Sequence, residues 1–126
     1  MNAWLTRDDE LPATDPAALD RLKRFGGDRL LHKMIALFLT AAPERIAAAR
    51  TACATGDAPA AERALHSLRS SSGQLGAVRM QQLSEQGEHR ARRGSLDGVA
   101  QLADELEQEL ERVRHWLATV SVEGAA

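Results

Sequence analysis

The strongest constraint on the fold is an apolar repeat near the end of the chain. Apolar residues recur there at alternating three- and four-residue steps, at Leu96, Val99, Ala103, Leu106, Leu110, Val113, Leu117 and Val120. This spacing places an apolar seam along an α-helix of several turns, and most of the stability of such a helix comes from packing that seam against other helices. The segment therefore predicts a helical bundle.

Composition agrees with an all-α domain. The chain has 126 residues, no tyrosine, two phenylalanines and two tryptophans, so the aromatic packing typical of β-sheets is not expected. This length fits one domain with a single core. We expect a flexible arm over residues 1–14, the domain over residues 15–120 and a flexible tail over residues 121–126.

Capping residues, prolines and glycines divide the rest of the chain into further helices. We expect these helices between Asp15 and Gly26, between Asp28 and Gly56, between Asp57 and Gly76, and from about Val78 to Arg93. Pro43 interrupts the second, which is either one helix kinked at Pro43 or two helices nearly in line. Short connections make neighbours antiparallel, which predicts an up-down antiparallel four-helix bundle with an additional short N-terminal helix.

Several function classes are disfavoured. The net charge of −2 and the lack of aromatic residues among the arginines of residues 90–93 argue against nucleic-acid binding. The single cysteine, Cys53, excludes an internal disulfide and a zinc site built from several thiolates. There is no apolar run of roughly 20 residues and no signal-peptide core, so we expect a cytoplasmic protein without membrane contact.

The predicted helix between Asp57 and Gly76 carries an unusual polar stripe. At about 100° per residue, one side of this helix collects Glu62, His66, Arg69, Ser70 and Gly73, whereas Leu65, Leu68, Ser72 and Leu75 form the inward face. The run Ser70–Gly73 costs about 2–3 kcal/mol in helix propensity relative to alanine, so helix stability does not explain it. Small side chains beside an exposed His66 leave its imidazole open to another protein, and Arg69 could contact a phosphoryl group there.

This segment resembles a known family. Residues Leu65 to Ala77, read as Leu-His-Ser-Leu-Arg-Ser-Ser-Ser-Gly-Gln-Leu-Gly-Ala, are similar to the motif of histidine-containing phosphotransfer domains, with His66 at the phosphorylated position. Residues 15–19, 25–27 and 38–43 resemble the family's first two helices, and residues 83–94 resemble the helix that faces the active histidine. The resemblance covers about Asp15 to Leu117.

Three positions depart from the family pattern. Arg69 stands where lysine is usual, which keeps the charge but replaces a compact ammonium with a planar fork. Ser70 replaces glycine, and Gly87 replaces a larger apolar residue, which leaves the packing of its helix unexplained. Glu88 matches a family position that carries Glu or Gln and supports the histidine ring.

The resemblance implies a phosphoryl relay. His66 would be the phosphoryl acceptor, Arg69 would stabilise phosphoryl charge, and Glu88 would orient the imidazole. Partner contacts would involve Glu62, Arg63, Ser70, Gly73 and Arg92. The partners would be receiver domains of a hybrid histidine kinase and of a response regulator. The chain would need no cofactor or metal of its own, because Mg²⁺ would be bound by the receiver, and without a nucleotide-binding loop it would have no kinase activity. We expect a monomer.

Two alternatives remain open. The chain could be a non-catalytic helical adaptor that binds a receiver or a coiled-coil partner through the seam of its last helix. Glu88 and Arg92, four residues apart, could form an ordinary ion pair on the helix surface. His32, His89 and His115 lack a setting like that of His66, and we expect them to be surface or boundary residues.

Overall fold

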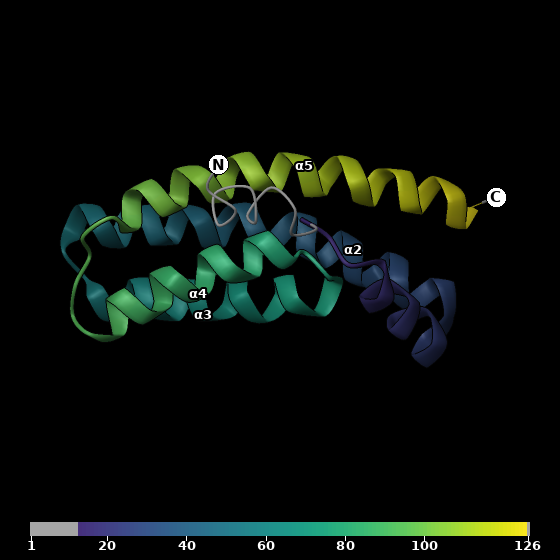
Figure 1. Ribbon diagram of the computed structural model, residues 1–126, viewed down its shortest axis with the longest axis horizontal. Helices are drawn as coiled ribbons and strands as arrows, with labels where there is room; N and C mark the ends of the chain where they lie inside the picture. Colours follow the sequence, from purple (N-terminus) through teal and green to yellow (C-terminus); the bar gives the residue numbers. More distant parts are fainter. Residues whose placement is uncertain (1–12, 126) are drawn as a thin grey trace, which may run out of the picture.

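The protein is an all-α four-helix fold. The computed structural model describes residues 13–125, with side chains as far as Val120. Its helices are α2 (Pro16–Thr55), α3 (Ala58–Leu75), α4 (Val78–Arg92) and α5 (Val99–Ala125). Figure 1 shows them running back and forth, and contacts between α2 and α3, α3 and α4, α4 and α5, and α2 and α5 close a ring. The predicted four-helix fold is confirmed.

The predicted short N-terminal helix is not counted as a separate element, because α2 joins two helical segments across a kink, and the first segment, residues 16–26, lies where that helix was expected. Helix α2 begins at Pro16, capped by the side chain of Asp15, and continues to Thr55 with one interruption at Gly27. The φ of 71° at Gly27 lies in the left-handed region, which glycine adopts without a Cβ penalty. Pro43 keeps helical dihedrals, because its ring favours a helical φ, so the break lies at Gly27 and not at Pro43.

The first described residues are hydrogen-bonded to the turn between α3 and α4 and to the first turn of α4. The N–H of Asp15 donates to the Gly76 carbonyl at 2.7 Å, and the N–H of Arg79 donates to the Ala13 carbonyl at 3.3 Å. Gly76 has a φ of 76°, and a Cβ at this position would collide with the Asp15 carbonyl oxygen. Glycine is therefore required at residue 76 both by the backbone dihedral and by the close approach of a second segment.

The core follows the predicted seams. Helix α5 buries Val99, Ala103, Leu106, Leu110, Val113 and Leu117, while Leu96 and Val120 are partly buried. The helix begins at Val99, so Leu96 lies in the connection from α4. It continues to Ala125, beyond the predicted domain end at residue 120. The predicted arm lies outside the described residues as far as residue 12.

Helix α4 packs closely on α3 because several residues on its inner face have small side chains. Its buried residues are Met80, Ser84, Gly87, Glu88 and Ala91. A Cβ on Gly87 would lie 2.7 Å from Leu65 Cδ1, so the missing side chain makes room for a leucine of α3. This explains the glycine at residue 87 and brings the next residue, Glu88, close to α3.

Candidate functional site: a histidine held by a buried glutamate

His66 lies in the middle of α3 with its side chain in solvent. The helix begins at Ala58, with the Asp57 carboxylate accepting the Ala60 N–H, and ends at Gly76. Leu65 and Leu68 point into the core, which turns His66 outward, and 57% of its side chain is exposed. The predicted exposure of this imidazole is confirmed.

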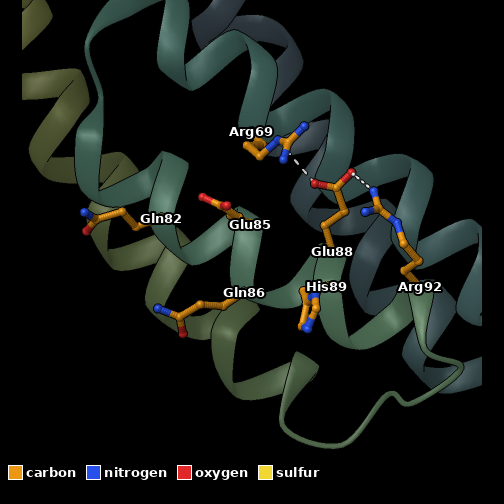
Figure 2. A pocket seen from close by; sticks show the side chains of 7 residues that line it. All are labelled: Arg69, Gln82, Glu85, Gln86, Glu88, His89 and Arg92. Atoms are coloured by element: carbon orange, nitrogen blue, oxygen red, sulfur yellow. Dashed lines mark hydrogen bonds and ion pairs between the residues drawn. The ribbon is translucent and has the colours of Figure 1, made fainter.

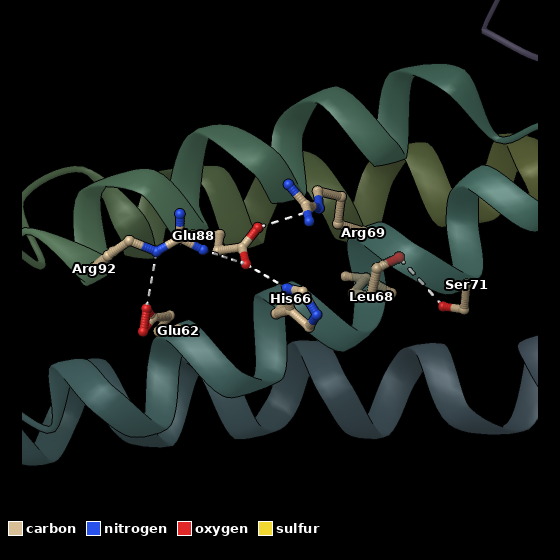
Figure 3. A network of polar contacts seen from close by, with 7 residues as sticks. All are labelled: Glu62, His66, Leu68, Arg69, Ser71, Glu88 and Arg92. Carbon is tan, nitrogen blue, oxygen red and sulfur yellow. Dashed lines mark hydrogen bonds and ion pairs between the residues drawn. The ribbon is translucent and has the colours of Figure 1, made fainter.

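A buried carboxylate holds one nitrogen of the imidazole. Glu88 on α4 is only 2% exposed, and its Oε2 lies 2.5 Å from Nδ1 of His66. A carboxylate can only accept a hydrogen bond, so Nδ1 carries the proton and donates it. Figure 3 shows the other ring nitrogen, Nε2, turned away from Glu88. In neutral His66, this arrangement leaves the Nε2 lone pair available as a nucleophile.

Two arginines surround the same carboxylate. Nη2 of Arg92 donates to Oε2 of Glu88 at 3.0 Å. Nε of Arg69 lies 3.2 Å from Oε1 as an ion pair, in an orientation that does not form a hydrogen bond. A buried carboxylate without such partners would be strongly destabilising, so these guanidinium groups make its burial possible.

Arg92 also reaches back to α3. Its Nε donates to Oε2 of Glu62 at 3.3 Å, and Glu62 precedes His66 by one helical turn. Arg92 therefore joins two glutamates from different helices, as Figure 3 shows. We call the five residues Glu62, His66, Arg69, Glu88 and Arg92 the Glu88 network. The simpler interpretation of Glu88 and Arg92 as an isolated surface pair is wrong, because Glu88 is buried and also bonded to His66.

An open hollow of about 550 Å³ lies beside the network. Figure 2 shows the side chains that line it, which are Arg69, Gln82, Glu85, Gln86, Glu88, His89 and Arg92. Four of them, Gln82, Glu85, Gln86 and His89, were not among the predicted site residues. Their three- and four-residue spacing on α4, in phase with Glu88 or Arg92, is the signal that could have found them.

Comparison with known proteins decides the family. The family model described as "Hpt domain" matches residues 33–116, which is most of the chain. The chain belongs to the Hpt domain family. The resemblance seen in residues 65–77 is thereby confirmed.

A solved structure agrees with this assignment. The chain is similar to histidine-containing phosphotransfer protein B (HptB) from Pseudomonas aeruginosa PAO1, at 26% sequence identity and a TM-score of 0.83. The match covers 90% of this chain and 97% of that one. A search of curated proteins finds no match.

The remaining predicted contact residues of this Hpt domain lie on or beside the outer surface of α3. Arg63 and Ser70 are exposed, and Ser72 is fully buried as predicted. Gly73 is half-buried, and a Cβ there would lie 2.9 Å from Nε2 of Gln81 on α4. This corrects the interpretation of Gly73 as part of an exposed stripe, because it also serves the packing of α3 against α4.

Other candidate groups carry less chemistry. Within residues 13–125 no cluster of three or more metal-ligating side chains occurs, and no helix has both the length and the apolar character that crossing a membrane requires. Burial raises the pKa of the Cys53 thiol, while the nearby Arg50 acts in the opposite direction. His89 and His115 are exposed, and His32 is half-buried at the boundary.

Proposed function

We propose that this Hpt domain relays a phosphoryl group between receiver-domain aspartates through Nε2 of His66. The observation that carries the proposal is the contact between Nδ1 of His66 and the buried carboxylate of Glu88, which turns Nε2 away from Glu88 on a side chain that is 57% exposed (Figure 3). Hpt domains act with receiver domains in phosphorelays, and the family match supports the same chemistry here.

The reaction would proceed in two reversible steps. The lone pair of Nε2 attacks the phosphorus of a receiver's aspartyl phosphate, an N–P bond forms, and the P–O bond to the aspartate breaks as its carboxylate leaves. Positive charge then grows on the imidazole ring, and Glu88 stabilises it through the Nδ1 proton. In the second step the carboxylate of another receiver attacks phosphorus, and the N–P bond breaks.

Arg69 would stabilise the charge of the phosphoryl oxygens. It lies one turn beyond His66 on α3, and its side chain is 34% exposed. Its contact with Glu88 is not a hydrogen bond, so the guanidinium N–H groups remain available to an incoming phosphoryl group. The exchange of Glu88 for phosphoryl oxygens would require only a side-chain movement.

The receivers would supply the rest of the active site. The acceptor aspartate and Mg²⁺ would belong to the receiver, and the domain would act without a cofactor or kinase activity of its own. The expected partners are the receivers of a hybrid histidine kinase and of a response regulator. We propose that they dock over His66 with contacts to Arg63 and Ser70, both exposed on α3.

Transfer from a phosphorylated receiver tests the proposal. A receiver domain phosphorylated with acetyl phosphate and freed of excess donor is mixed with the protein, and phosphate on each protein is followed over time. We expect transfer to the wild type and none to His66→Gln, while receiver binding survives the substitution. Binding without transfer to the wild type would favour the adaptor function instead.

A further inference from the structure

A carboxylate beside a histidine has two opposing effects on phosphoryl transfer. Through Nδ1 it fixes the ring and stabilises positive charge as the phosphoryl group arrives. The same negative charge also favours protonation of the free imidazole, and a doubly protonated ring has no lone pair on Nε2. A useful carboxylate must therefore be held at Nδ1 while part of its charge is offset.

We propose that Arg92 is a positioning residue for this reaction. Held by Glu62, it fixes Oε2 of Glu88 on Nδ1 of His66 and, together with Arg69, offsets part of the carboxylate charge, so that Glu88 orients the imidazole with Nε2 turned away from it. This inference rests on the proposed function of His66 and adds the residue that positions its carboxylate.

The geometry at a single oxygen supports the positioning role. Oε2 of Glu88 accepts from Nη2 of Arg92 at 3.0 Å and from Nδ1 of His66 at 2.5 Å. A carboxylate oxygen has two lone-pair directions, so occupation of one by Arg92 leaves the other for the imidazole. Because Glu88 is 2% exposed, water cannot readily replace the arginine in this role.

The second glutamate explains how an exposed arginine stays in place. The Arg92 side chain is 58% exposed, and a long exposed side chain bound at one end only would sample several rotamers. Nε donates to Glu62 on α3 while Nη2 donates to Glu88 on α4. Two anchors on different helices restrict the guanidinium to one orientation across the helix interface.

The charges around His66 nearly balance. Helix α3 contributes Glu62 and Arg69, and α4 contributes Glu88 and Arg92, so these four groups sum to zero. Glu85 and His89 of α4 line the adjoining hollow. Among the described residues, α2 and α5 supply no ion pair to Glu88. Removal of Arg92 leaves the cluster one charge more negative at the imidazole.

Phosphorylation by phosphoramidate separates this role from receiver docking. In that reaction Nε2 of His66 bonds to phosphorus and the P–N bond of the donor breaks, releasing ammonia. Rates are measured from about pH 5.5 to pH 9 for the wild type, Arg92→Ala, Arg92→Lys and Glu62→Gln. Dividing each variant's rate by the wild-type rate at the same pH removes the donor's own ionisation.

We expect Arg92→Ala to react about tenfold more slowly near neutral pH and to recover in part as pH rises, with the acid limb of the pH–rate profile displaced upward. Arg92→Lys should restore the position of the acid limb because it keeps the positive charge. It should still react more slowly than the wild type, because an ammonium group lacks the planar fork of donors by which the guanidinium contacts both glutamates. Glu62→Gln should slow the reaction less than Arg92→Ala and should not displace the acid limb upward, because it removes a negative charge from the cluster. Arg112→Ala, which removes an arginine from the other buried glutamate, Glu109, should match the wild type.

Ring ¹⁵N NMR of His66 provides a second readout. The wild type should show the tautomer protonated at Nδ1, and Arg92→Ala should show a mixture with the doubly protonated ring at the same neutral pH. Coincident pH profiles and identical ¹⁵N spectra for the two proteins would overturn the role of Arg92. A wild-type chain that accepts phosphate from neither phosphoramidate nor a receiver would instead overturn the proposed function, and this inference with it.

Discussion

Replacement of Glu88 measures what the buried carboxylate contributes to transfer. Glu88→Gln keeps the shape and one acceptor for Nδ1 of His66 but removes the charge. A hydrogen bond to a charged group contributes about 1.5–3 kcal/mol, and one between neutral groups about 0.5–1.5 kcal/mol. The difference of about 1–1.5 kcal/mol predicts transfer about five- to twelvefold slower, since 1.36 kcal/mol corresponds to a factor of ten. Glu88→Ala removes the acceptor entirely, and we expect a loss of about a hundredfold.

Single-turnover transfer from a phosphorylated receiver, quenched in denaturant, gives these rates. Thermal melts of the same samples report folding. Glu109→Gln is the matched control, because Glu109 is also 2% exposed and pairs with arginines at 3.4 Å and 3.8 Å, but lies in the groove between α4 and α5. It should transfer at the wild-type rate. A folded Glu88→Ala protein that transfers as fast as the wild type would refute the reasoning.

Four further results are expected. Arg69→Ala should slow transfer several-fold with stability changed by less than about 1 kcal/mol, and unchanged rates at all ionic strengths would make it only a surface residue. Ser70→Trp should block receiver docking with little effect on the melting temperature, whereas Ser72→Trp should destabilise the bundle by about 1–3 kcal/mol or more. Normal transfer by Ser70→Trp would show that the receiver docks elsewhere. Gly76→Ala should lower the free energy of unfolding in urea by about 2–4 kcal/mol, from the left-handed φ and the collision with the neighbouring carbonyl, and an unchanged midpoint would contradict this. Burial raises the pKa of the Cys53 thiol, so the folded protein keeps the thiol proton to higher pH than the unfolded chain does. The stabilisation that this difference contributes is present below the ordinary thiol pKa and is lost as pH rises through the raised value. Alkylation of Cys53 near pH 8 should be slower than alkylation of a free thiol, and equal rates would contradict the burial.

Much of the fold could be predicted from local signals. The apolar seam of α5 and the Asp57 and Gly76 boundaries of α3 follow from spacing and capping alone. The break at Gly27 likewise falls at the predicted boundary between Gly26 and Asp28, whereas the effect of Pro43 on α2 could not be assigned from the sequence. Pro43 is a stronger helix breaker than glycine by propensity, yet its φ suits a helix and it is exposed, so the chain absorbs the lost hydrogen bond there and bends at Gly27.

The site was predictable only in part. The helical period around residue 66 gave the exposure of His66 and the burial of Ser72. The contact between His66 and Glu88 joins two helices, and periodicity within each helix does not specify which residues meet across an interface; only the family resemblance paired them. The link from Arg92 to Glu62 spans the same interface, and no spacing rule indicated it.

Mapping the phosphate on the wild-type protein tests the central proposal most directly. After transfer from a phosphorylated receiver, the protein is digested and its peptides are kept alkaline, where phosphohistidine survives, for fragmentation by mass spectrometry. The chain has four histidines, and we predict phosphate on His66 alone, because of the four only His66 combines an exposed side chain with a carboxylate on Nδ1. Phosphate on His32, His89 or His115 with His66 unmodified would contradict it.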